Sequence, residues 1–266
     1  RNRPVALADG FGFGEEIGQF ARVERLDDVR VAERPRDTRL AQESLHDERA
    51  RFANVGVKEL ERAVTKLGMK GALINGHTRG SYLDDRKYWS LFECAQALDV
   101  PIYLHPAQPH QTVADIYYKD YLKEFPALLT AGWGFGVETA TQSIRLVLSR
   151  VFEKHPKLKI IIGHMGEGLP FSLWRINQAL SRQGNRPIPF RDVFCEHFWI
   201  TTSGNFSNPA LLCSVMELGV DRIIFSVDYP FVPNKPGVDW IPTIPLCKED
   251  KVKILSGNAR KLLKMK

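Results

Sequence analysis

Three short apolar runs in the sequence each end on an ionisable residue. Residues 101–104 lead into His105, residues 160–163 into His164, and residues 223–227 into Asp228. A short apolar run bounded by turn residues is typical of a strand buried on both faces in a parallel sheet. In barrels of alternating strands and helices, catalytic side chains lie at the C-terminal ends of the strands, where these three residues are found. The pattern therefore predicts an enzyme in which two histidines and one aspartate converge from three strands.

The most chemically suggestive segment spans residues 163–168, where a histidine and a glutamate lie among glycines. Glu167 follows His164 by three residues, so that a turn can bring the two side chains together. A carboxylate next to an imidazole raises its pKa and fixes its tautomer, which suits a proton relay. A helix cap, with Glu167 as a first-turn acid favoured by the helix dipole, explains the same residues without a catalytic role.

Each of the other candidate residues has a functional and a structural interpretation. A carboxylate that follows an apolar strand must be paired, metal-bound or protonated, so Asp228 suits metal ligation or proton transfer. His105 is either a metal ligand, a donor to substrate or a hydrogen-bonded core histidine. Arg175 can clamp a substrate carboxylate or serve as a surface residue, and Phe231 can line a pocket or pack in the core. The sequence contains no GxSxG, P-loop or HExxH motif, so no motif supports a serine hydrolase.

The elements that position these residues alternate regularly after residue 57. Strands are predicted at 71–75, 101–105, 160–164, 199–203 and 223–228, and helices at 57–67, 84–98, 136–154, 168–182, 208–218 and 249–264. A further strand is predicted at 5–8, helical pieces within 21–51, and an insertion at 113–124. Alternation of this kind gives a parallel sheet covered by helices. Polar residues at nearly every strand end favour a closed barrel, because an open doubly wound sheet binds its ligand at a single switch point.

The length and composition fit one large α/β domain or two small ones. The chain has 266 residues, of which 44% are hydrophobic and 26% charged, which excludes a disordered or fibrous protein. Its net charge of +6 is concentrated in residues 248–266, where seven Lys or Arg accompany two acidic residues. Since no stacking aromatic residues alternate with these basic side chains, we expect a solvated helix face and no nucleic-acid partner.

Cysteine usage and hydropathy indicate a protein of the cytoplasm. The four cysteines (Cys94, Cys195, Cys213 and Cys247) form no CxxC pair and are expected to be reduced and buried. The sequence has no apolar run of about 18 residues and no secretory leader, so no membrane partner is expected. Because the chain begins with Arg1 and not with Met, we expect a processed or partial product.

Four segments follow one another in the order found in a known family. Residues 101–106, 162–167, 201–206 and 225–231 together resemble the amidohydrolase-related decarboxylases, closest to the γ-resorcylate and 2,3-dihydroxybenzoate decarboxylases. The similarity covers roughly residues 57–266, whereas residues 1–56 match poorly. The resemblance implies one α/β domain over 1–266, a distorted (β/α)₈ TIM barrel with a shortened or incomplete N-terminal part, in a homodimer or homotetramer.

The resemblance also implies the reaction and the residues that perform it. The expected activity is that of a carbon–carbon lyase, the non-oxidative decarboxylation of a hydroxylated aromatic acid. By position, His105 corresponds to a metal ligand, and Asp228 to the residue that both binds metal and delivers a proton to the ring. His164 and Glu167 correspond to the relay behind Asp228. A divalent ion (Zn²⁺, Mn²⁺ or Mg²⁺) would hold carboxylate and phenolate oxygens of the substrate, and no organic cofactor is implied.

The partner implied by the resemblance is a small aromatic acid. Arg175 corresponds to a residue on the substrate side, and Phe231 to a wall of the aromatic pocket. A metal-dependent hydrolase that uses an activated water is the alternative on the same barrel. A non-catalytic or repurposed relative with a degenerate site is the alternative from another class.

The sequence departs from the family near its N-terminus. The first strand of the family ends in a Glu-x-His or Glu-x-Ala pattern that supplies metal ligands, whereas residues 5–7 are followed by Ala8, Asp9 and Gly10. His105 and Asp228 are then too few ligands for a tight Zn²⁺ site, which usually has three or four. Three explanations remain open: residues missing from the sequence, weak or absent metal binding, and a degenerate site.

Overall fold

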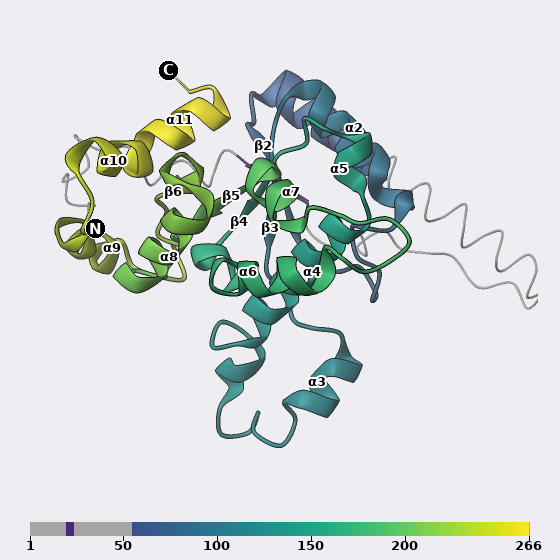
Figure 1. The fold of residues 1–266 in the computed structure, drawn as a ribbon, viewed down its shortest axis with the longest axis horizontal. Helices are drawn as coiled ribbons and strands as arrows, with labels where there is room; N and C mark the ends of the chain where they lie inside the picture. The colour runs from purple at the N-terminus through teal and green to yellow at the C-terminus, as the bar shows by residue number, and fades with distance from the viewer. Residues whose placement is uncertain (1–19, 24–54, 266) are drawn as a thin grey trace, which may run out of the picture.

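The sheet consists of parallel strands in the order in which they occur along the chain. The computed structural model describes residues 20–23 and 55–265 (Figure 1). Its strands are β1 (Phe20–Val23), β2 (Gly71–Asn75), β3 (Ile102–His105), β4 (Ile160–Ile162), β5 (Phe198–Thr201) and β6 (Ile223–Ile224). Each strand pairs in parallel with the next one along the chain. A doubly wound sheet would require the order to reverse at one point, so the consecutive order fits the predicted barrel.

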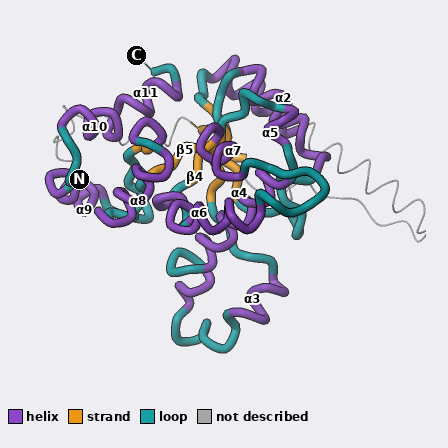
Figure 2. The backbone as a smooth tube through the Cα atoms, in the orientation of Figure 1, coloured by secondary structure: helices purple, strands orange, loops and turns teal. Residues whose placement is uncertain are grey.

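Helices connect and cover these strands (Figure 2). After a helix at 55–67 come α2 (Trp89–Leu98), α3 (Gln111–Tyr117), α4 (Gly134–Leu148), α5 (Val151–Lys154), α6 (Leu169–Leu180), α7 (Phe190–His197), α8 (Asn208–Leu218), α9 (Asn234–Trp240), α10 (Lys248–Val252) and α11 (Asn258–Leu263). Short 3₁₀ turns separate several of them, and a π-helical turn, Lys253–Gly257, joins α10 to α11. None of the helices within 55–265 is long and apolar enough to cross a membrane.

The core is built from both faces of the strands. Ile160, Ile161 and Ile162 of β4 are each at most 2% exposed. Because side chains alternate along a strand, Ile160 and Ile162 join the main core, whereas Ile161 packs in a second cluster with Tyr103 and residues of α11. Two apolar faces explain why these strands appear in the sequence as continuous apolar runs.

Local signals in the sequence define some helices correctly. The predicted helix at 208–218 is confirmed by α8, which begins after Ser207 and carries Pro209 in its first turn. The Ser207 hydroxyl accepts a hydrogen bond from the Ala210 amide at 3.5 Å, and Gly219, with φ of +86°, ends the helix. A capping hydroxyl, an early proline and a glycine of positive φ are typical helix boundaries.

Other expectations are wrong in their boundaries. The helix predicted at 136–154 is divided between α4 and α5 because Arg150 has a φ of +63°. The strand predicted to reach Asp228 ends at Ile224. Of the residues 21–51 in which helical pieces are predicted, 21–23 belong to strand β1. Residues 24–51, like the strand predicted at 5–8, lie outside the described residues. Helices α7 and α9, of 8 and 7 residues, were not predicted since so few turns carry little periodicity.

The basic residues near the C-terminus lie at the surface, as predicted. Lys248, Lys253, Arg260, Lys261 and Lys264 are all exposed. The four cysteines are free, as expected, but Cys247 is exposed and the other three are half-buried, so the predicted full burial is wrong.

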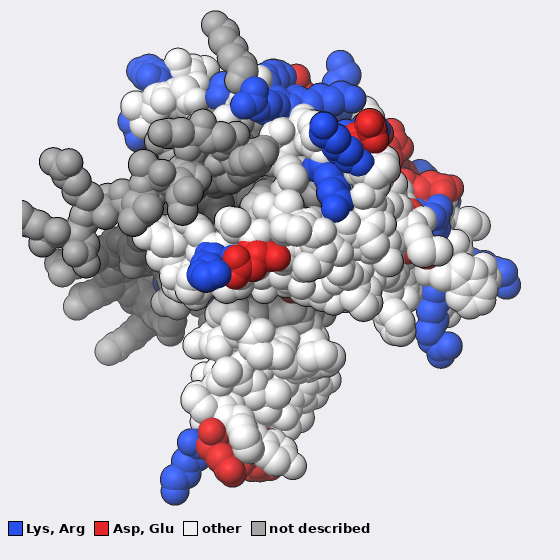
Figure 3. Space-filling view, turned by 90° about the vertical axis from the view of Figure 1, so that its left-hand side faces the viewer, with Lys and Arg blue, Asp and Glu red and all other residues white. Residues whose placement is uncertain are grey.

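The insertion predicted at 113–124 is part of a larger segment, 111–133, that projects from the barrel (Figure 1). Most of its visible surface in Figure 3 is uncharged, with charged side chains gathered at the tip. Its large exposed hydrophobic side chains are Ile116, Tyr117, Tyr121, Phe125 and Trp133.

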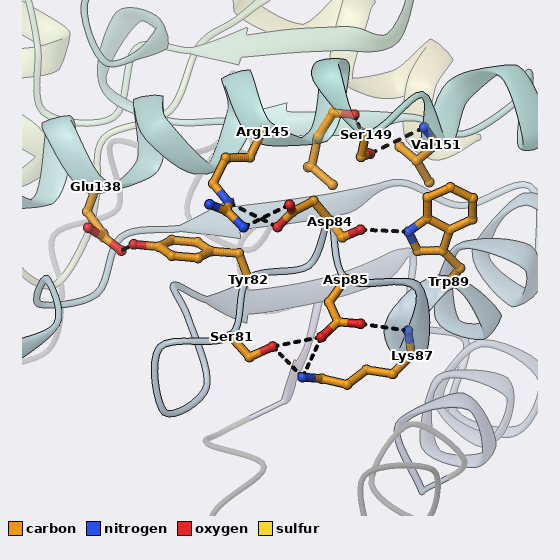
Figure 4. A network of polar contacts seen from close by, with 11 residues as sticks. Ser81, Tyr82, Asp84, Asp85, Lys87, Trp89, Glu138, Arg145, Ser149 and Val151 are labelled. Carbon is orange, nitrogen blue, oxygen red and sulfur yellow. Dashed lines mark hydrogen bonds and ion pairs between the residues drawn. The ribbon is translucent and has the colours of Figure 1, made fainter. Parts of the chain in front are cut away.

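A polar network fixes the segment after β2 to α4 (Figure 4). The Tyr82 hydroxyl donates to Glu138 Oε1 at 2.5 Å, and Glu138 is only 5% exposed. The Arg145 guanidinium makes two hydrogen bonds with the Asp84 carboxylate, at 2.9 and 3.1 Å, and lies 4.6 Å from the centre of the Tyr82 ring. The Trp89 indole donates to the Asp84 carbonyl at 3.1 Å. These contacts fix the approach to α2, and sequence spacing indicated none of them.

Candidate active site

His164 lies between two carboxylates that come from different parts of the chain. Its Nδ1 atom is 2.6 Å from Glu167 Oε1, and its Nε2 atom is 3.8 Å from Asp228 Oδ2. The first contact is a short hydrogen bond, and the second is an ion-pair distance just beyond hydrogen-bond length. The Glu167 side chain is 5% exposed, whereas His164 and Asp228 are 28% and 23% exposed. The structure therefore brings together the three residues predicted to handle protons, with Glu167 innermost.

The backbone that carries this pair is unusual. Residues 164–168 all have positive φ, from +50° at His164 to +77° at Gly166. For a residue other than glycine this conformation costs about 1–2 kcal/mol, and such strain is concentrated at functional sites. The left-handed turn folds Glu167 back onto His164 before α6 begins at Leu169, and the first turn of α6 contains no acidic residue. The helix-cap interpretation of Glu167 is therefore wrong.

Glycine is favoured at position 166 by space as well as by conformation. A Cβ atom there would lie 2.7 Å from Ile200 Cδ1 and 2.9 Å from Pro170 Cδ. The turn thus packs directly against β5 and the start of α6.

The two carboxylates determine the protonation of the histidine. Burial alone would lower the pKa of His164, but polar and coulombic interactions with Asp228 and Glu167 outweigh it and raise the pKa to about 10. At neutral pH the ring is therefore an imidazolium, which donates from Nδ1 to Glu167 and directs its Nε2 proton toward Asp228.

Asp228 is positioned by the segment that follows β5. Asp228 has a φ of +75°, and its carbonyl accepts from the Val232 amide at 3.0 Å. A Cβ atom on Gly204 would lie 3.7 Å from Asp228 Cβ and 2.9 Å from Val232 Cγ2, so this glycine permits a close approach. Asn205 Nδ2 lies 3.5 Å from the His164 carbonyl. Residues 202–205 thus contact both the histidine and the aspartate, a role that sequence reasoning did not identify.

His105 presents the ligand nitrogen that a metal requires. It lies half-buried at the end of β3, with Nδ1 2.9 Å from the Pro106 carbonyl. A carbonyl only accepts hydrogen bonds, so Nδ1 carries a proton, and in the neutral form of the ring Nε2 is the nitrogen that can bind a metal. An imidazole nitrogen and a carboxylate such as that of Asp228 are donor types that suit a divalent ion. Within residues 55–265 and β1, however, no three His, Cys, Asp or Glu side chains form a group that could hold a metal.

The two residues predicted on the substrate side lie at the surface. Arg175 is exposed on α6, and Phe231, three residues after Asp228, is 77% exposed. Neither makes a hydrogen bond or ion pair with His164, Glu167 or Asp228 in the described part of the chain. The structure therefore leaves both side chains accessible without joining them to the three acid–base residues.

The chain is similar to known proteins. A family model described as amidohydrolase matches residues 4–265. The γ-resorcylate decarboxylase of a Polaromonas species is 42% identical over 222 residues, which cover 79% of this chain and 67% of the relative.

Solved structures show the same likeness. A dihydroxybenzoic acid decarboxylase from Polaromonas, with bound manganese and the inhibitor 2-nitroresorcinol, has a TM-score of 0.75 and 39% identity, covering 85% of this chain and 74% of that one. A 2,6-dihydroxybenzoate decarboxylase in complex with 2,6-dihydroxybenzoate has a TM-score of 0.73 and 37% identity, covering 85% and 76%.

The match to the family model includes the segments that carry His105, His164 and Asp228. The relative and the solved structures each cover more than three quarters of the chain. They confirm the predicted α/β fold of the amidohydrolase type, a distorted (β/α)₈ barrel. The chain belongs to the amidohydrolase family.

Proposed function

We propose that this protein is a carboxy-lyase that removes CO₂ from a hydroxylated aromatic acid without oxidation. The observation that carries the proposal is the contact of His164 with both Glu167 and Asp228. It supplies a proton donor at the strand ends of a barrel whose relatives decarboxylate γ-resorcylate and dihydroxybenzoate.

The reaction replaces the carboxylate of the ring with a proton. Asp228 delivers this proton to the ring carbon that bears the carboxylate, the carbon–carbon bond then breaks, and its electron pair restores the aromatic ring as CO₂ leaves. The Nε2 proton of the His164 imidazolium renews the acid on Asp228, and Glu167 stabilises the cation during the exchange. The raised pKa of His164, about 10, keeps this proton available at neutral pH.

His105 and Asp228 would hold a divalent ion, and the manganese in the Polaromonas structure makes Mn²⁺ the first ion to test. When bound, such an ion would polarise and orient the oxygens of the substrate. His105 contributes Nε2, with its orientation fixed by the Pro106 carbonyl. No organic cofactor enters the proposal.

The proposed substrate is a small aromatic acid. The Arg175 guanidinium is suited to its carboxylate, and the Phe231 ring is suited to its aromatic face. One domain over 1–266, assembly as a homodimer or homotetramer and a cytoplasmic location remain predictions from the sequence. Light scattering of the purified protein tests the assembly.

The direct test is CO₂ release from a panel of hydroxybenzoates, with Mn²⁺ supplied, by the wild type and by Asp228→Asn. The amide is nearly isosteric but cannot deliver the proton, so we expect kcat to fall by about 10²-fold or more. Equal rates in the two proteins would exclude Asp228 as the donor. Absence of turnover on every aromatic acid would favour the binding or repurposed alternative, and release of a hydrolysis product would favour the hydrolase.

A further inference from the structure

A layer of buried hydroxyl groups lies beneath the candidate active site. The Tyr103 hydroxyl on β3 is 3.0 Å from Thr201 Oγ1 and 3.1 Å from Ser203 Oγ. Ser203 Oγ is in turn 2.6 Å from Thr201 Oγ1 and 2.6 Å from Ser226 Oγ. Tyr103, Thr201 and Ser203 are at most 8% exposed. Four hydroxyls from three segments therefore satisfy one another in the interior of the barrel.

The layer has a fixed relation to the residues above it. Tyr103 precedes His105 by two positions, and Ser226 precedes Asp228 by two. Residues two apart along an extended segment project to the same side, and in a barrel such side chains form stacked layers. The hydroxyl layer thus lies one level below His105, and Ser226 belongs to it two positions before Asp228.

Ser226 needs this support because the strand that leads to Asp228 ends early. β6 comprises only Ile223–Ile224, and its last regular contact with β5 is the hydrogen bond from the Thr202 amide to the Ile224 carbonyl, at 3.0 Å. A parallel ladder would continue from the Ser226 amide to the Thr202 carbonyl. The Thr202 side chain replaces that bond, since its Oγ1 accepts from the Ser226 amide at 2.9 Å and donates to the Ser226 carbonyl at 2.6 Å.

Ser203 makes two further contacts with Ser226. The Ser203 amide donates to Ser226 Oγ at 3.3 Å, in addition to the contact between the two hydroxyls. Thr202 is completely buried, so water cannot readily replace its two hydrogen bonds. Ser226, two positions before Asp228, is consequently held by Thr202 and Ser203, which follow β5, where main-chain pairing has stopped.

We propose that Thr202 is a positioning residue, which holds Ser226 and thereby sets the position of Asp228 relative to His164. The inference rests on the proposed function for its kinetic consequence, but its structural content is independent of that function. Catalysis by an acid depends steeply on placement, and a displacement of about 1 Å can reduce a rate by about 10²-fold.

The variants that test it are Thr202→Val and Thr202→Ser. Valine keeps the shape of the side chain but removes both hydrogen bonds with Ser226, whereas serine keeps the hydroxyl. Thr139→Val on α4 is the matched control, because Thr139 is 2% exposed and its Oγ1 has no hydrogen-bond partner in the described part of the chain.

We expect Thr202→Val to lower kcat by about 10- to 100-fold with KM nearly unchanged, Thr202→Ser to retain most of the activity, and Thr139→Val to match the wild type. A purely structural role of Thr202 would reduce the amount of folded enzyme without changing kcat per active site. Wild-type kcat in Thr202→Val, or equal losses in Thr202→Ser and Thr202→Val, would overturn the proposal.

Crystal structures of Thr202→Val and Thr139→Val separate this inference from the proposed function. We expect the separation of His164 Nε2 and Asp228 Oδ2 to change in Thr202→Val alone, whether or not the wild type decarboxylates any acid. An unchanged separation in Thr202→Val would contradict the inference even if the decarboxylase activity is found.

Discussion

The imidazole of His164 joins Glu167 at 2.6 Å on one side and Asp228 at 3.8 Å on the other, across 64 positions of sequence between His164 and Asp228. The short contact is local and depends on a left-handed turn. The longer contact depends on the packing of β4, β5 and β6 side by side. A local turn and a long-range contact therefore combine to place one imidazolium ring between two carboxylates.

Removal of the Glu167 charge should weaken the relay. In Glu167→Gln the carboxylate that accepts from His164 Nδ1 is replaced by an amide, so the pKa of His164 should fall. We expect kcat near neutral pH to decrease by about 10- to 100-fold, and the alkaline limit of the kcat profile to move to lower pH. The pH dependence of kcat checks this, and an unchanged alkaline limit would show that His164 does not control it.

The raised pKa of His164 predicts that the stability of the metal-free protein depends on pH. The pKa of His164 is raised from 6.5 to about 10 in the folded state, so the folded protein retains a proton that the unfolded chain releases first. The resulting stabilisation is fully present below pH 6.5 and is lost as the pH rises through about 10. Urea unfolding of the wild type and His164→Gln should give free energies of unfolding whose difference narrows across this range. A constant difference from pH 6.5 to 10 would argue against the raised pKa.

Metal removal should abolish turnover if His105 contributes to an ion site. Treatment with a chelator should stop CO₂ release, and added Mn²⁺ should restore it. His105→Ala should need a higher Mn²⁺ concentration for half-maximal rate, because one nitrogen ligand is lost. Full activity after exhaustive chelation, with no metal found by elemental analysis, would exclude the metal-assisted mechanism.

Gly166→Ala should damage the turn that carries His164. The new Cβ atom would lie 2.7 Å from Ile200 Cδ1, at a backbone φ of +77°. Gly184→Ala is the matched control, with a φ of +80° and no atom within 4 Å of the new Cβ. The control should lose about 1–2 kcal/mol of stability from backbone strain alone, and Gly166→Ala should lose more and also lose activity. Equal losses of stability in urea unfolding would show that the Ile200 contact can relax.

Tyr82→Phe should destabilise the attachment of the segment after β2 to α4. It removes the hydroxyl that donates to Glu138 at 2.5 Å and leaves a carboxylate that is 5% exposed without this partner. We expect a loss of about 1–3 kcal/mol in the free energy of unfolding. Tyr117→Phe, at a side chain that is 65% exposed, should lose almost nothing. A result for Tyr82→Phe within error of this control would show that water replaces the hydroxyl.

The sequence alone determined the alternation of strands and helices, and the residues that end the strands. These are local properties: the apolar runs before His105 and His164 reflect strands buried on both faces, and Ser207 and Gly219 mark the ends of α8. It also indicated that Glu167 could reach His164, because three positions are within the span of one turn.

The tertiary structure decided how these residues meet. No periodicity in the sequence indicates that β6 stops at Ile224. Because it stops there, the side chain of Thr202 and not the main-chain ladder holds Ser226, two positions before Asp228. Nor does the sequence distinguish Tyr103 from the apolar neighbours of its strand, although its hydroxyl bonds to Thr201, 98 positions away. Such contacts depend on the packing of distant strands, because a hydroxyl or carboxylate finds its partner only when the barrel brings their strands together.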